Sequence, residues 1–319
     1  MTGERDSSVS HPEADASAPL PEGCTETPRP VDILLVTDTS GSMIEELETL
    51  ADQIPDFLLG LANPPDRDGE PEWPPVRDIH VGVAPTGLSG SLATRGDPER
   101  GECRTSYSPF QSMSPGTDVT EVANAVSCVA TNTYSRSDEA LLGTMARALL
   151  PSDHPLHPPA GPNLGDTENR GFLRPGSILV VLFITDEDDE TRCTLGDDPA
   201  CDEECRVFPG PMTFCDGPGR LEAYVDALRS VRPPEDLLVG TLAGAAPAAT
   251  SETEVFESFE GVRPTSFVCS DGLRRGQPAP RIARFTFDLG GEYRSICSET
   301  YAALTGAIAE RVGARVCAP

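Results

Sequence analysis

Two short apolar runs constrain the fold of this chain most strongly. Residues 32–37 read DILLVT and residues 177–185 read SILVVLFIT. Nearly continuous apolar runs of this length are typical of strands that are buried on both faces of a parallel sheet. Both runs end in threonine followed by aspartate, which is Asp38 in the first case and Asp186 in the second. We therefore expect a parallel sheet with an aspartate at the carboxyl end of two of its strands.

Helical patterns alternate with the predicted strands. In residues 42–61 apolar side chains recur at helical spacing, and glutamates occupy the first turns, where the helix dipole favours them. Similar patterns predict helices over residues 118–130, 138–150, 220–231 and 298–312, and strands over residues 78–84 and 237–242. Strands that alternate with helices predict an α/β fold, in which a doubly wound, mostly parallel central sheet is flanked by helices and carries disulfide-bearing loop insertions.

The chain divides into a leader and one domain. Residues 1–28 are polar, acidic and rich in proline, so we expect a disordered leader. Residues 29–319 are expected to form a single domain with insertions at about 85–116, 187–218 and 246–283. We expect the last of these insertions to be irregular.

The charge balance excludes several classes of function. The chain has 52 acidic residues against 24 basic ones and a formal net charge of -28, so nucleic acid is not expected as a partner. Every basic residue is arginine, which excludes a lysine nucleophile. The sequence also lacks an apolar run of the roughly 18 residues that a transmembrane helix requires.

The ten cysteines favour an oxidising compartment. We therefore expect an extracytoplasmic protein, secreted or at the cell surface, although the first residues show no signal peptide. Proximity in the chain suggests disulfides between Cys103 and Cys128 and between Cys269 and Cys297. Four further cysteines lack the short spacing of zinc knuckles and favour two disulfides over a zinc site: Cys193, Cys201, Cys205 and Cys215.

The strand ends carry the chemistry, because ligands of open α/β sheets bind outside the carboxyl ends of the strands. Asp38 and Asp186 are far apart in sequence, but neighbouring parallel strands would bring them together. Two carboxylates at one sheet edge repel each other unless a cation lies between them. Oxygen ligands suit a hard divalent cation, with Mg²⁺ as our first choice and Mn²⁺ or Ca²⁺ as alternatives.

These residues resemble a known family. The motif Asp38-x-Ser40-x-Ser42 after the first apolar run, together with Thr185-Asp186 after the later one, resembles a von Willebrand factor A domain with a metal-ion-dependent adhesion site. The resemblance covers about residues 31–312. The many cysteines make the chain more similar to the cell-surface or lipoprotein-type von Willebrand A proteins of bacteria than to animal adhesion receptors.

The resemblance implies a set of metal ligands. The two serines would bind the ion directly through their hydroxyls, and the two aspartates would act partly through waters. A threonine usually completes such a site, but the loop before residue 138 lacks the expected TxTxxA motif. We expect Ser137 to supply the missing hydroxyl because it directly precedes a predicted helix, with Ser135 as an alternative. The expected metal ligands are therefore Asp38, Ser40, Ser42, Ser137 and Asp186.

Several features have plainer interpretations. The DTSGS motif alone would also fit a strand-to-helix turn in which Ser42 is the N-cap. The acidic residues between 186 and 204 predict a solvated loop, with a loose calcium site as the alternative. Because the ends of this fold usually lie close together, a bridge between Cys24 and Cys317 is also expected.

The resemblance favours a binding module over an enzyme. In this hypothesis the cation coordinates an Asp or Glu carboxylate of a protein partner, and residues 86–91 border the site, because the insertion at 85–116 directly follows a strand end and the one at 246–283 does not. One alternative is a metal-dependent hydrolase, in which the ion activates water and Glu187 or Asp188 is the general base. Another is a structural domain with an empty site. The sequence leaves the partner and the oligomeric state open.

Overall fold

The computed structural model describes most of the predicted domain. The described residues are 28–67, 69–88, 90–97, 102–132, 140–156, 161–189, 220–263, 265–272 and 274–317. Several predictions fall outside these residues and stay predictions: the leader, Ser135, Ser137, most of the acidic tract, Cys24 and the four clustered cysteines.

A six-stranded sheet organises the described part of the chain, in the order β10-β7-β6-β1-β4-β5. Its strands are β1 (Val31–Thr37), β4 (Ile79–Pro85), β5 (Phe110–Met113), β6 (Ile178–Ile184), β7 (Leu237–Ala243) and β10 (Glu292–Ser295). The strand order reverses at β1, which pairs in parallel with β4 on one side and β6 on the other. Only the edge strand β5 pairs antiparallel with its neighbour among these strands. The predicted α/β fold with a mostly parallel sheet is confirmed.

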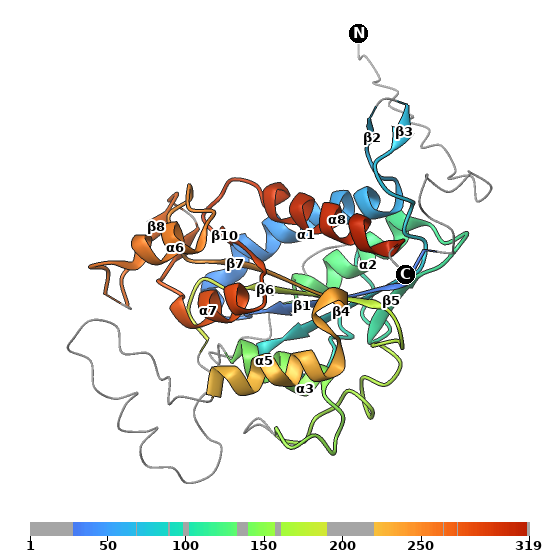
Figure 1. Ribbon diagram of the computed structural model, residues 1–319, viewed down its shortest axis with the longest axis horizontal. Coiled ribbons are helices and arrows are strands. Elements are labelled where there is room, and N and C mark those ends of the chain that lie inside the picture. The colour runs from blue at the N-terminus through green and yellow to red at the C-terminus, as the bar shows by residue number, and fades with distance from the viewer. Residues whose placement is uncertain are drawn as a thin grey trace.

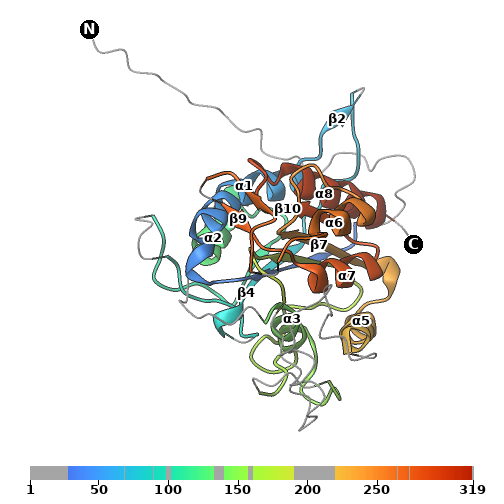
Figure 2. The same cartoon turned by 90° about the vertical axis from the view of Figure 1, so that its left-hand side faces the viewer.

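Helices cover both faces of the sheet (Figure 1). The helices α1 (Ile44–Ala62), α2 (Val119–Ala130) and α8 (Ala302–Val316) lie on one face, and α3 (Leu141–Leu149), α5 (Arg220–Val231) and α7 (Pro280–Asp288) lie on the other, as the view in Figure 2 also shows. Alternate residues of β1 serve the two layers: Ile33 packs toward the first face and Leu34 toward the second. This two-sided burial explains why the strand reads as a continuous apolar run.

The insertion at about 246–283 is not irregular, so that prediction was wrong. It contains α6 (Glu252–Phe259), a small hairpin of β8 (Cys269–Ser270) and β9 (Arg275–Gly276), and the start of α7. The first helix is only two turns long and the hairpin strands have two residues each, so neither shows a clear hydrophobic period. The Ser251-x-x-Glu254 capping box that begins α6 was a readable signal. Strand β10 was also missed.

Smaller differences concern helix ends and hairpins. Ser42 is not an N-cap, because it lies inside the short 3₁₀ helix Gly41–Met43 that precedes α1. Asp118 caps α2, since its carboxylate accepts a hydrogen bond from the backbone of Thr120. A hairpin of β2 (Asp66–Arg67) and β3 (Glu70–Pro71) projects from the domain (Figure 1). Two further 3₁₀ helices are Thr86–Leu88 and Pro234–Asp236.

Two predicted disulfides are present. Cys103 is bonded to Cys128 and Cys269 to Cys297, with Cα–Cα distances of 5.6 and 6.1 Å. Cys317 is also disulfide-bonded, while its predicted partner Cys24 lies outside the described residues. None of the helices in the described residues combines the length and apolar character that crossing a membrane requires.

A buried ion pair fastens the amino ends of the central strands. Asp32, the second residue of β1, is fully buried and accepts hydrogen bonds of 2.7 Å from the backbone nitrogen and from Nε of Arg174. Ser177, directly before β6, donates to the same carboxylate at 2.5 Å, and Arg174 also pairs with Asp78. Both carboxylate oxygens of Asp32 are therefore satisfied within the protein.

We predict that the substitution Asp32→Asn lowers the free energy of unfolding by about 3 kcal/mol, because it removes the buried one of the two carboxylates that pair with the partly buried Arg174. Urea denaturation followed by circular dichroism measures this change. The control Glu121→Gln breaks an exposed ion pair with Arg104 and should cost less than about 1 kcal/mol. Similar losses in both variants would contradict a special role for the buried pair.

Candidate functional site

The carboxyl ends of β1 and β6 meet at Asp38. Its backbone nitrogen donates to the carbonyl of Ile184 at 2.9 Å, which continues the ladder between the two strands. One oxygen of its buried carboxylate accepts a hydrogen bond from the Ser40 backbone at 2.7 Å, and the other accepts from the Thr185 hydroxyl at 3.1 Å. The side chain of Asp38 therefore links the turn after β1 to the end of β6.

The two serines of the motif lie side by side on this turn. The hydroxyls of Ser40 and Ser42 are 2.9 Å apart. Ser40 is buried, whereas Gly41 and Ser42 are exposed, and a side chain added at Gly41 would meet no atom within 4 Å. The hydroxyl pair thus spans the boundary between the buried carboxylate and solvent, and the turn leaves room for a ligand.

Asp186 completes this group of side chains. It is 3% exposed, and its Oδ1 is buried without a hydrogen-bond partner. Burial and the nearby charge of Asp38 raise the pKa of Asp186 to about 8, although a hydrogen bond from Ser42 opposes the shift. Burial also raises the pKa of Asp38, against the hydrogen bonds from Ser40 and Thr185. Two buried carboxyl groups in mutual contact favour binding a proton or a cation.

Four of the five predicted ligands are therefore brought together, and the fifth, Ser137, lies outside the described residues. The carboxyl end of β4, the other parallel neighbour of β1, also contacts the turn after β1. The Thr86 hydroxyl, directly after β4, lies 3.5 Å from the hydroxyl of Thr39, and the Gly87 backbone donates to Thr39 at 3.4 Å. These contacts support the expectation that the loop beginning at Thr86 borders the site.

Asp188 and Asp189 contact the starts of two helices, so the prediction of a solvated loop was wrong for these two residues of the acidic tract. Asp188 accepts hydrogen bonds of 3.1 Å from the backbone of Arg281 and Ile282 at the start of α7. Asp189 accepts one of 2.9 Å from Leu142 at the start of α3 and pairs with Arg281 at 2.8 Å. Burial raises the pKa of Asp188 to about 7, although the helix amides oppose the shift. These two residues anchor helices rather than face solvent.

The hairpin of β8 and β9 is a neighbour of the site that sequence reasoning missed. The backbone of Gln277, directly after the hairpin, donates to the Asp186 carbonyl at 2.7 Å, and its side chain donates to Glu187. The sequence analysis predicted that the insertion at 246–283 does not directly follow a strand end. This was wrong, since β7 ends at Ala243, just before that insertion. No local pattern in the sequence signals this contact, because it depends on how a long loop returns to the sheet.

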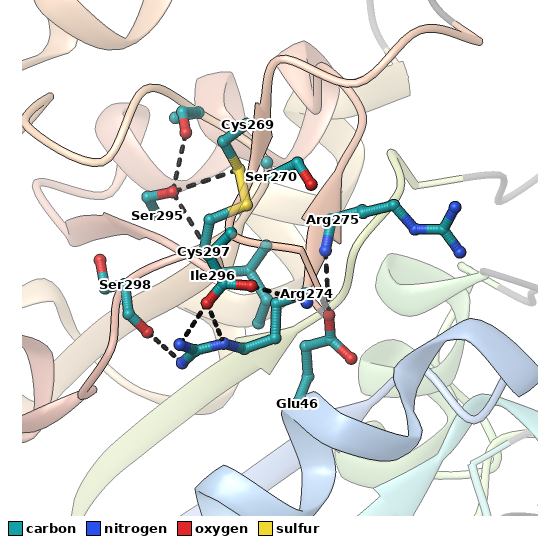
Figure 3. The surroundings of a disulfide bond; sticks show 12 residues. Glu46, Cys269, Ser270, Arg274, Arg275, Ser295, Ile296, Cys297 and Ser298 are labelled. Atoms are coloured by element: carbon teal, nitrogen blue, oxygen red, sulfur yellow. Dashed lines mark hydrogen bonds and ion pairs between the residues drawn. A yellow bond between two sulfur atoms is a disulfide. The ribbon is translucent and has the colours of Figure 1, made fainter.

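Glu46 joins the hairpin to the first turn of α1 (Figure 3). Its carboxylate is fully buried and accepts a hydrogen bond of 3.3 Å from the Arg275 backbone, while its Oε2 has no hydrogen-bond partner. Burial raises the pKa of Glu46 to about 7, and its charge also contributes to the raised pKa of Asp186. Glu46 therefore acts on the candidate site through its charge.

Comparisons with known proteins give limited information. No protein-family model and no curated protein matches the sequence. The chain is similar to the human COPII-coat protein Sec24c, with a TM-score of 0.39 and 12% identity over 90% of this chain and 33% of that one. It is also similar to proximal thread matrix protein 1 of the mussel byssus, with a TM-score of 0.31 and 9% identity over 83% and 49%. The chain thus spans a third and half of these two chains, and such weak likeness says nothing about function.

We predict that Asp186→Asn stabilises the metal-free protein by roughly 3 kcal/mol more at pH 8 than at pH 5. Folding raises the pKa of Asp186 to about 8. Between about pH 4 and pH 8 the folded state therefore binds more protons than the unfolded state, and stability falls as the pH rises. Asparagine is neutral throughout this range.

Urea denaturation in the presence of a chelator measures this difference. The control is Glu48→Gln, which removes an exposed carboxylate from α1. It should not change how the free energy of unfolding depends on pH. If the free energy of unfolding of wild type and of Asp186→Asn changed with pH in the same way, the proposed repulsion between the carboxyl groups of Asp38 and Asp186 would be contradicted.

Proposed function

We propose that this chain is a von Willebrand A-type binding module that uses a divalent cation to hold a carboxylate of a protein partner. One observation carries the proposal. Asp38 and Asp186, from the ends of neighbouring parallel strands, are both buried in one cluster, and one oxygen of Asp186 has no hydrogen-bond partner. A cation would satisfy this oxygen and remove the repulsion between the two carboxylates.

The side chains present fit such an ion. Carboxylate and hydroxyl oxygens form a hard donor set, which suits Mg²⁺ first and Mn²⁺ or Ca²⁺ next. Asp38, Ser40, Ser42 and Asp186 would hold the cation, with Ser137 as the expected fifth ligand. When bound, the ion would supply the positive charge that attracts a carboxylate to a strongly acidic protein. The exposed turn at Gly41 and Ser42 is the open side from which a partner could approach.

The proposed setting is outside the cytoplasm. The disulfides of Cys103 with Cys128 and of Cys269 with Cys297 support an oxidising compartment, such as secretion or the surface of a bacterial cell. A partner at such a surface would reach the cation site without crossing a membrane.

We predict that isothermal titration calorimetry detects one Mg²⁺ or Mn²⁺ per chain and that Asp38→Ala weakens binding at least about 100-fold. The substitution removes the carboxylate that connects both strand ends. The matched control Glu48→Gln removes an exposed acidic side chain from α1 and should leave the affinity within about twofold of wild type.

Equal affinity of Asp38→Ala and wild type would contradict the proposed ligand set. Absence of binding by the wild type with all three ions would instead favour a structural domain with an empty site.

The competing proposal is a metal-dependent hydrolase at the same site. The contacts of its two candidate general bases support it less well. Glu187 accepts a hydrogen bond from Gln277, and Asp188 accepts from the first amides of α7. A screen of ester and phosphoester substrates with Mn²⁺ separates the two classes. Turnover that requires Mn²⁺ and disappears in Asp186→Ala would establish the hydrolase instead.

A further inference from the structure

Two exposed apolar side chains flank the candidate site. Ile44 and Phe267 are 47% and 48% exposed, and they are the large hydrophobic residues that the described part of the chain leaves exposed. Ile44 is the first residue of α1, two positions after Ser42. Phe267 lies two residues before the β8–β9 hairpin and under the guanidinium of Arg275, which is 4.8 Å from the ring centre. We call these three residues, Ile44, Phe267 and Arg275, the hairpin rim.

Hydrogen bonds place the hairpin rim next to the candidate site. The Arg275 backbone donates to Glu46 on the first turn of α1, and Gln277 donates to the carbonyl of Asp186. Both contacts are made by the backbone. The side chain of Arg275 is therefore left to face outward, and Figure 3 shows it extending away from Glu46.

The guanidinium of Arg275 lacks a counter-charge within the described residues. It is exposed and forms no ion pair there, although the chain carries a net charge of -28. The neighbouring Arg274, by contrast, pairs with Asp271 and donates to the Ser298 carbonyl. An unpaired arginine stacked on an exposed aromatic ring is the kind of group that contributes most to protein interfaces.

The hairpin rim is also held rigidly. The Cys269–Cys297 disulfide joins the start of the hairpin to the segment after β10, and Arg274, directly before β9, donates to the Ser298 carbonyl of the same segment (Figure 3). A surface that is already ordered loses less conformational entropy when a partner binds.

We propose that the hairpin rim is a second contact surface for the same partner, and that it selects a protein segment with an acidic side chain next to an apolar one. The acidic side chain would pair with Arg275 and the apolar one would pack on Phe267 or Ile44, while a separate carboxylate meets the cation. This inference rests on the proposed cation-dependent binding and adds the charge and polarity of the partner.

The test uses displayed peptides with random sequence around a fixed aspartate. Peptides are bound in Mg²⁺ and eluted with a chelator, in parallel on wild type, Arg275→Glu and Arg229→Glu. Arg229 is an exposed arginine on the last turn of α5, on the opposite face of the sheet, so its substitution is a control with the same change in net charge. Calorimetry with Mg²⁺ alone verifies that each variant keeps its cation site.

Wild type and Arg229→Glu should select peptides with a second acidic residue beside an apolar one. Arg275→Glu should select a basic residue in place of the acidic one. The peptide selected by wild type should bind Arg275→Glu at least about tenfold more weakly, and Phe267→Ser several-fold more weakly, at unchanged Mg²⁺ affinity.

Two kinds of result would overturn the inference. Identical sequence preferences of wild type and Arg275→Glu, or no enrichment of any peptide by a wild type that binds Mg²⁺, would exclude the hairpin rim as a contact surface. Peptides that stay bound in the chelator would instead contradict the cation-dependent function. The two failures are therefore distinguishable.

Discussion

The parallel pairing of β1 with β6 is the constraint on which the candidate site depends. Thr37 is aligned with Ile184, so the residues that follow these strands emerge side by side at one edge of the sheet. The hydrogen bond from Thr185 to Asp38 then fixes the carboxylate between the two strand ends. A shift of one residue in this register would turn one of the two carboxylates to the other face of the sheet. The hydrogen bond from the Asp38 backbone to the Ile184 carbonyl continues the same register beyond the two strands.

The acidic composition of the chain has two different physical outcomes. At the amino ends of the strands, Asp32 is buried but satisfied, because Arg174 and Ser177 donate to both of its oxygens. At the carboxyl ends, Asp186 is equally buried but keeps an oxygen without a partner. Burial of a carboxylate is costly unless it is compensated. The uncompensated Asp186 therefore marks the edge of the sheet at which we propose that a ligand binds, whereas the compensated Asp32 marks a structural contact.

The segment after Asp186 integrates the candidate site with the rest of the fold. Asp188 and Asp189 hold the first turns of α7 and α3, where carboxylates satisfy free backbone amides. Gln277 ties the β8–β9 hairpin to the same segment. The segment from Asp186 to Asp189 therefore contacts two helices and a hairpin, so a shift of Asp186 would also displace these elements.

The class of fold was predictable from the sequence, because the apolar runs before Asp38 and Asp186 are typical of parallel strands and alternate with helical patterns. The sequence also determined which polar residues leave those strands, since the DTSGS and TDEDD segments follow the runs directly. Two features became visible only in the folded chain: the Asp188 carboxylate caps a helix, and the hairpin around Arg275 lies beside Glu46. Local patterns report which face of an element is apolar, but a contact between a loop and a distant strand end depends on how the whole chain packs. That is why the strand ends were predictable and the loops around them were not.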